Sequence, residues 1–353
     1  LQGTNTYTGG TFVNGGTLKV EANTGSLPAG GALTFTGTGA FNSDNTGATV
    51  ALSPSLGALT LAAGDATVQS TRTAAQNLSL TFSSLAARPV GATGNFVASG
   101  GVNGTENQVV LTGAALGFMD QGSFFGGSNY AYMNAAGTYV RAPAYGTDSG
   151  FTTAGTITAD THVKLTATPA AQDSVTLNTL LLSGGNVGFP LNAGQTLTLA
   201  SGGLLKAGAG AAAAVSGGTG IRAGSGVELV VRTDASGDDL TISTPILANG
   251  VNGLTKSGAG LLTIAATNTY TGPTTLNAGV MRIATVSNGG TAGMLGQSDR
   301  GASNLVFNGG TLRYTGTGSS ANTDRGFTLG AGGGTIDVTN GTYNVDSGAT
   351  TLT

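Results

Sequence analysis

The sequence is short of several features on which proteins commonly rely for folding and chemistry. Its 353 residues include no cysteine, no tryptophan and only 8 prolines, and 8 % of them are charged, where about 25 % is typical. The missing cysteines exclude a disulfide framework and thiolate metal sites. No run of about 18 apolar residues occurs, so we expect no membrane-embedded helix.

Charged residues are too scattered to favour a polyanionic partner. The 13 lysines and arginines occur singly and the net charge is -3, so no basic patch is available to neutralise phosphates. We therefore expect no nucleic-acid partner and no polybasic attachment to lipid. The low charge does not predict disorder, because 39 % of the residues are hydrophobic and can form a core.

What the chain has in abundance is glycine, with 63 residues, and short runs in which a charge stands between two apolar residues. Examples are Leu18–Val20, Val163–Leu165 and Val227–Leu229. The two-residue period of a strand points the charge to one face and its neighbours to the other. Helical periodicity is hard to find, so the pattern predicts an all-β protein with one wet face on each sheet.

One phrase occurs twice, 263 residues apart: NTYTGGTFVNG from Asn5 to Gly15 and NTYTGPTTLNA from Asn268 to Ala278. Asn-Gly pairs between alternating runs are also typical of β-hairpins. We prefer a coil, because a coil that bends at corners needs the same Gly and Asn backbone conformations on every turn.

Shorter repeats give the length of one turn. Similar runs recur after 22 residues, from Leu305–Phe307 to Phe327–Leu329, and after 24 residues, from Leu312–Tyr314 to Ile336–Val338. Such steps suit a β-solenoid, and the chain length then predicts roughly 15 rungs. We expect one continuous elongated domain, with rungs over residues 1–112 and 152–353 and an aromatic-rich insertion or elaborated rung over 113–151.

The insertion is the strongest candidate for an interaction surface. It is rich in Tyr and Phe, which stack on sugars or dock a neighbouring subunit when they are exposed. The alternative, which we favour, is a small satellite core beneath a long loop. The aromatic residues are Phe118, Phe124, Phe125, Tyr130, Tyr132, Tyr139, Tyr145 and Phe151.

Three stretches resemble a known bacterial repeat. Residues 257–279 (SGAGLLTIAATNTYTGPTTLNAG) closely resemble the autotransporter-associated β-strand repeat of large secreted surface proteins. Leu1–Val20 resembles the second half of that repeat, and Asn304–Tyr314 the unit that commonly follows; Pro273 replaces a glycine of the phrase. The resemblance implies a right-handed parallel β-helix, export beyond the outer membrane, and a structural or adhesive role at the cell surface.

Residues with catalytic potential are few. His162 is the single histidine, with Asp160 two residues away as a conceivable partner, but a surface histidine on a strand is the favoured interpretation. Asp238 and Asp239 form the densest acidic spot, as in polysaccharide-active β-helix enzymes. Adjacent residues of a strand point to opposite faces, which favours a turn instead. We predict no catalytic, cofactor or metal site and no enzyme activity.

Three functions remain, in decreasing order of support. The first is a rigid structural rod or filament, because Leu1 and Thr353 both lie inside repeat-like phrases. We therefore expect end-to-end self-association or continuation in a longer chain. The second is an adhesin passenger that binds glycans or host or biofilm surfaces. The third and remote one is a polysaccharide-active enzyme.

Overall fold

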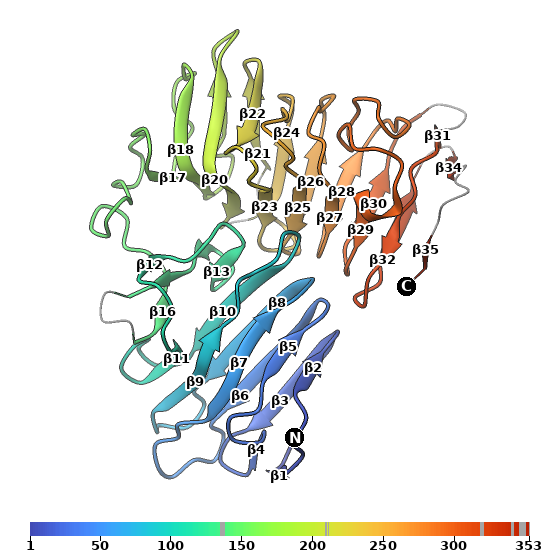
Figure 1. Ribbon diagram of the computed structural model, residues 1–353. Coiled ribbons are helices and arrows are strands. Elements are labelled where there is room, and N and C mark those ends of the chain that lie inside the picture. The colour runs from blue at the N-terminus through green and yellow to red at the C-terminus, as the bar shows by residue number, and fades with distance from the viewer. Residues whose placement is uncertain are drawn as a thin grey trace. The chain divides into compact units, whose positions relative to one another are not determined.

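A computed structural model describes residues 1–134, 138–208, 210, 212–317, 321–339, 342–345 and 351–352. The chain divides into two compact units, Leu1–Pro143 and Ala144–Thr353. The predicted fold class is confirmed, because both units are built mainly from stacked parallel strands, with about 13 solenoid turns in total (Figure 1). The pairs β12–β15, β13–β14 and β15–β16 of the first unit are antiparallel. In the described ranges the single helical element is the 3-10 turn η1 (Ala302–Asn304). Fewer turns than the expected 15 form because long loops such as 284–301 use residues without adding strands.

The first unit consists of two long sheets and two short ones. One long sheet has the order β14 (Asn129–Tyr130), β13 (Ser123–Phe125), β10 (Thr93–Ser99), β8 (Asp65–Thr71), β6 (Gly39–Asp44) and β3 (Gly16–Glu21). The other has the order β11 (Asn107–Leu111), β9 (Leu78–Leu85), β7 (Ser55–Leu61), β5 (Leu33–Phe35) and β2 (Thr11–Val13). The short sheets are β1 (Gly3–Thr4) with β4 (Gly25–Ser26), and β12 (Gly117–Phe118) with β15 (Tyr132–Met133) and β16 (Val140–Arg141).

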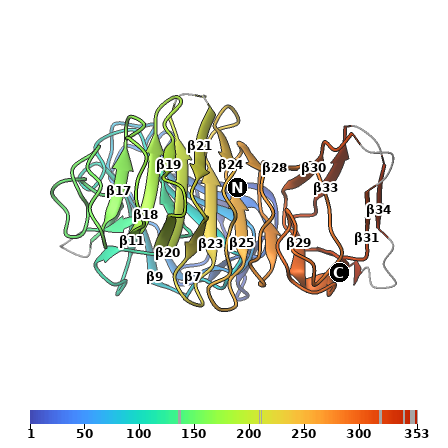
Figure 2. The same ribbon diagram turned by 90° about the horizontal axis from the view of Figure 1, so that it is seen from above.

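The second unit repeats this arrangement with longer ladders, which Figure 2 shows from above. Its main sheet has the order β17 (His162–Leu165), β18 (Val175–Ser183), β20 (Thr196–Ala207), β23 (Leu229–Thr233), β25 (Leu254–Ser257), β27 (Thr274–Leu276), β29 (Leu305–Phe307), β32 (Thr328–Leu329) and β35 (Thr351–Leu352), and β22 (Gly220–Ala223) also pairs with β20. The second sheet has the order β19 (Phe189–Leu191), β21 (Ala212–Gly217), β24 (Asp239–Ile242), β26 (Leu261–Ile264), β28 (Val280–Ile283), β30 (Thr311–Tyr314) and β33 (Thr335–Val338). A short pair joins β31 (Ala321–Thr323) to β34 (Tyr343–Val345).

The register places equivalent residues of successive turns directly above one another. Leu262 pairs with Met281, and Met281 pairs with Leu312. All three are buried, and they extend the hydrophobic core of the second unit along its stack. The next residue along each strand is only partly buried, as Arg282 and Arg313 show. The predicted alternation between a core face and a wet face is therefore confirmed here.

Glycine is required where one corner lies against the corner of the preceding turn. Gly279 ends the repeated phrase with a φ of 64°. A Cβ at this position would lie 2.5 Å from the carbonyl oxygens of both Gly258 and Gly260. A side chain would therefore strain the backbone and push the two turns apart.

Charged side chains do not always lie on the solvent-exposed face of a strand. Glu228, expected to be exposed, is only 4 % accessible. It lies in the corner before β23, where the Thr255 hydroxyl of the next turn donates a hydrogen bond of 2.7 Å to its carboxylate. Lys256 is fully buried, and its Nζ donates to the carbonyl oxygens of Ser257, Gly258 and Ala278. Corners supply enough oxygen atoms to satisfy buried charges, so this part of the prediction is wrong.

Candidate functional site

In the first unit, half of the predicted aromatic surface is interior. Phe124 and Tyr130 are completely buried, and their rings stack with centroids 5.7 Å apart. Phe118 meets Tyr130 edge to face at 5.7 Å. Tyr132 is 8 % exposed, and the Arg141 guanidinium lies 4.3 Å from the centre of its ring. These residues form a small core shared by the β13–β14 hairpin and the short sheet of β12, β15 and β16, which is the alternative that the sequence favoured.

In the second unit, Tyr145 and Phe151 pack around the histidine. Tyr145 meets Phe151 edge to face at 5.2 Å, and Phe151 stacks on His162 at 4.3 Å. Burial raises the pKa of the Tyr145 hydroxyl. Of the seven residues proposed as an interaction surface, four are partly exposed: Phe118, Phe125, Tyr139 and Tyr145. Ligand binding by these four stays a prediction.

His162 is a buried residue and not the surface histidine that we expected. It is 6 % exposed, and its Nδ1 lies 2.9 Å from the Thr179 hydroxyl on the neighbouring strand. Burial lowers its pKa to about 4, so the ring is neutral at physiological pH. Asp160 lies in the turn before β17 with a φ of 58°. A histidine enclosed in this way is suited to packing rather than to proton transfer with a substrate.

Asp238 closes the turn that the sequence favoured, and Asp239 is the first residue of β24. The Asp238 backbone N–H donates to Ala235, and its carboxylate accepts a hydrogen bond from the Ala235 N–H. The same carboxylate lies 2.9 Å from Lys206 Nζ, and both side chains are at most 1 % exposed. The described residues contain no cluster of three His, Asp or Glu that would hold a metal ion. Asp238 is therefore one half of a structural ion pair.

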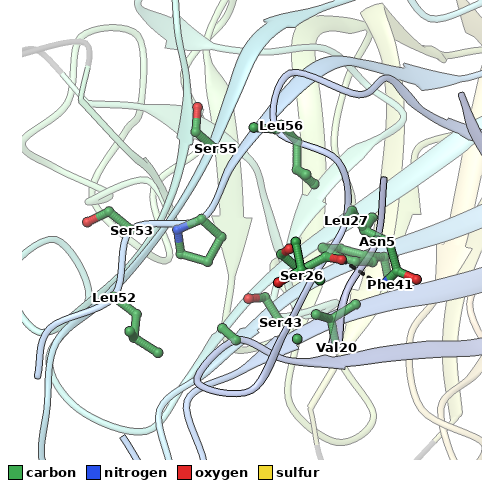
Figure 3. A pocket seen from close by; sticks show the side chains of 15 residues that line it. Asn5, Val20, Ser26, Leu27, Phe41, Ser43, Leu52, Ser53, Ser55 and Leu56 are labelled. Carbon is green, nitrogen blue, oxygen red and sulfur yellow. Dashed lines mark hydrogen bonds between the residues drawn. The ribbon is translucent and has the colours of Figure 1, made fainter. Parts of the chain in front are cut away.

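A cavity in the first unit was not foreseen. Its volume is about 370 Å³ and it lies among β3, β4, β6 and the segment before β7 (Figure 3). Its hydroxyl groups come from Thr4, Ser26, Ser43, Ser53 and Ser55. Its apolar wall is formed chiefly by Val20, Leu27, Phe41, Leu52 and Leu56.

The cavity lies where the backbone ladder of the solenoid is interrupted. β4 pairs with β1 of the preceding turn, and that sheet has two strands. The segment before β7 pairs with the following turn, since the Leu52 N–H donates to Asn77 and Leu52 accepts from Ser79. Ser26 and Leu52 thus lie on opposite sides of the gap (Figure 3). The sequence signal for this gap was the loss of the strand pattern between Asp44 and Pro54. Pro54 itself has no backbone N–H to donate to a neighbouring strand.

Ser43 is the unusual group in the wall of this cavity. Its side chain is 1 % exposed, and its hydroxyl has no hydrogen-bond partner within the protein. Ser70 occupies the same position one turn later. The Ser70 hydroxyl, however, donates to Asn107 Oδ1 at 2.6 Å. An unsatisfied buried hydroxyl lowers the free energy of unfolding by roughly 1–3 kcal/mol. Folding stability therefore does not explain why Ser43 lacks the partner that Ser70 has.

Comparison with known proteins gives the class of this chain. Residues 1–20 and 254–283 match the family described as passenger-associated-transport-repeat. The chain is 31 % identical over 361 residues to the adhesin BmaC autotransporter of Brucella suis biovar 1 (strain 1330). The alignment covers 93 % of this chain and 10 % of that relative. No solved structure matches the chain.

The stacked parallel turns and the repeated corner phrase define a passenger-type β-solenoid. The chain carries two matches to the passenger-associated-transport-repeat and is similar over most of its length to an autotransporter adhesin. These matches indicate a secreted protein at the bacterial cell surface, associated with the outer membrane. Within the described ranges, no helix has the length and hydropathy needed to span a bilayer.

Proposed function

We propose that this chain is an adhesive, non-catalytic segment of a larger surface protein. The observation that carries the proposal is the 31 % identity with an adhesin passenger, maintained over 93 % of this chain. The chain spans about one tenth of that relative, so the ligand of the whole protein does not follow from the comparison. The segment contributes a rigid surface on which binding groups are displayed at fixed spacing.

The physical properties of the solenoid support such a role outside the cell. Backbone hydrogen bonds join each turn to the next along both units. Such ladders resist pulling and proteolysis, because no short segment opens without breaking its bonds to two neighbours. The 8 % content of charged residues limits nonspecific electrostatic attraction, so binding depends on specific contacts.

Asp238 and His162, two of the residues with catalytic potential in the sequence, have structural roles. Asp238 is held in a buried ion pair with Lys206, and His162 is neutral and buried against Phe151. Neither presents a titratable group to a polysaccharide. Asp238 and His162 therefore lend no support to enzyme activity.

Adhesion is tested with beads coated with the folded chain and incubated with host cells, extracellular matrix and biofilm. We expect retention of these beads on at least one surface, and loss of retention for beads coated with the heat-unfolded chain. Equal retention of both kinds of bead, or of neither, contradicts the proposal.

End-to-end association of solenoids is a second candidate. β2 and β3 each form one edge of their sheet, and Phe12 on β2 is 67 % exposed. Such edges pair with a further turn of the same repeat, from a second copy or from the same chain. Electron microscopy over a concentration series tests this: filaments that lengthen with concentration support it, and short particles at every concentration contradict it.

A further inference from the structure

The cavity beside Ser43 has the chemistry of a binding site for a small neutral ligand. Hydroxyl groups and apolar side chains share its wall, and no charged side chain lines it. An anionic or cationic ligand would lose its hydration there without gaining an opposite charge. A purely apolar ligand would leave the buried Ser43 hydroxyl without a partner.

The size of the cavity restricts the ligand further. About 370 Å³ lies near the lower end of the range for small-molecule pockets, which is roughly 300–1,000 Å³. A single six-membered sugar ring fits this space and has both required surfaces. Its C–H groups pack on apolar walls such as Phe41 and Leu56, while its hydroxyls reach the serines around them.

We propose that the Ser43 cavity binds one hexose ring of a neutral glycan, an inference that rests on the adhesive function proposed above. Ser43 is the specificity group, because its hydroxyl faces the cavity and has no protein partner. The ring takes the place that Asn107 takes for Ser70 one turn later. The gap in the ladder between β4 and Leu52 provides the opening through which the rest of the glycan extends.

The amide of Asn5 fixes one side of the opening. Its Nδ2 donates to the carbonyl oxygens of Gly3 at 3.0 Å and Ser26 at 2.8 Å. These bonds join β1 to β4 across the solenoid turn and hold the Ser26 hydroxyl beside Ser43 (Figure 3). The site is therefore positioned by strands and by an anchored corner, which favours binding without a large ordering cost.

The test titrates the full 353-residue chain with the methyl glycosides of glucose, galactose, mannose and N-acetylglucosamine. Binding is measured from the NMR chemical shifts of the protein. We expect at least one of them to bind with a Kd on the order of 1 mM. Its shifts should centre on Val20, Ser43 and Leu56. Ser43→Ala should weaken this binding about three- to tenfold. Ser70→Ala is the matched control, and it should leave the Kd unchanged because Ser70 lies outside the cavity.

Four results would overturn the inference. They are the absence of binding by all four glycosides, an unchanged Kd in the folded Ser43→Ala variant, preference for an extended peptide over the sugars, and a crystal structure with only ordered water at Ser43 after soaking. Circular dichroism confirms that each variant is folded.

The bead assay separates this inference from the proposed function. Adhesion that persists in Ser43→Ala and is not inhibited by the glycosides contradicts the sugar site and leaves adhesion standing. Glycoside binding at Ser43 by a chain whose beads adhere to nothing contradicts the adhesive function and leaves the sugar site standing.

Discussion

The two copies of the repeated phrase have the same local structure and very different surroundings. The Tyr7 hydroxyl lies 2.5 Å from Thr11 Oγ1, and the Tyr270 hydroxyl lies 2.7 Å from Thr274 Oγ1. Yet Tyr7 is 41 % exposed, whereas Tyr270 is completely buried. The phrase therefore determines how its own corner is built, while its burial depends on what packs against it.

The loop at 284–301 makes the difference for Tyr270. Leu295 is buried beside it, and a Cβ at Gly296 would lie 2.6 Å from the Tyr270 ring. Arg325, one turn further on, donates to the Gly296 carbonyl at 2.8 Å and so holds this loop in place. Burial raises the pKa of Tyr270 to about 12.

The largest effect expected from this comparison is that of removing each tyrosine ring. Tyr270→Ala should lower the free energy of unfolding of the second unit by about 3–5 kcal/mol, because it leaves a cavity in the core. Tyr7→Ala should cost the first unit less than about 1 kcal/mol. Urea unfolding followed by hydrogen exchange in each unit measures both. Similar losses for the two variants would show that the exposed copy is also part of a core.

The ion pairs of the two units give the next comparison. Asp238→Ala should destabilise the second unit by about 3 kcal/mol, because Lys206 is left charged and buried. In the first unit, Lys19 lies 2.8 Å from Asp44 but its side chain is 46 % exposed. Lys19→Met should therefore lower the free energy of unfolding by less than Asp238→Ala does, because the Asp44 carboxylate keeps its hydrogen bonds from Thr46 and Thr73.

A double variant is the control for the buried pair. Lys206→Met with Asp238→Leu should recover part of the stability that Asp238→Ala loses, since neither charge remains buried. A double variant less stable than Asp238→Ala would mean that packing, and not the unpaired lysine, causes the loss. Thermal unfolding of the three variants side by side decides between the two causes.

Acid should weaken the second unit before the first. The folded pKa of His162, about 4, lies below its ordinary value of 6.5 because the ring is buried. A lowered histidine pKa means that the unfolded state binds the proton more strongly. The contribution of neutral His162 to the stability of the second unit is therefore intact above pH 6.5 and is lost as the pH falls toward 4. We expect a loss of about 2 kcal/mol by pH 5.

The first unit has no histidine, and its buried carboxylate responds at lower pH. Burial acts to raise the pKa of Asp44, but hydrogen bonds from Lys19, Thr73 and Thr46 lower it to about 2. Its contribution is present above pH 3.8 and is lost below it. Hydrogen exchange at pH 7 and pH 5 should show opening of the second unit alone. Equal opening of both units, or an unchanged response in His162→Phe, would contradict the assignment to His162.

The smallest expected difference in stability is between variants of Asn5 and Asn268, the asparagines that begin the two copies of the phrase. Asn268 is buried, accepts from the Ile246 N–H at 2.8 Å and donates to the Met294 carbonyl at 2.9 Å. Asn268→Ala should cost about 1–2 kcal/mol, because it leaves both backbone groups unsatisfied. Asn5→Ala should cost less, since Asn5 is partly exposed and water can replace its bonds. Equal costs in urea unfolding would mean that solvent does not reach Asn5.

The sequence by itself determined the architecture and much of the register. Apolar residues separated by one polar residue and repeated after 22 or 24 residues predicted stacked strands, and Phe307 does pair with Leu329 and Leu312 with Ile336. The glycine that ends each phrase predicted a tight corner, and Gly279 leaves no room for a side chain. These features are local, because a two-residue period and a positive φ act within one strand or one turn.

Only the tertiary structure decided which residues are buried, paired or left facing a cavity. Lys206 and Asp238 are 32 residues apart, and no pattern in the sequence relates them. Ser43 and Ser70 stand at equivalent positions, yet only Ser70 has a partner in Asn107. Such contacts depend on how the loops between turns fold, and loops have no period from which their neighbours can be predicted.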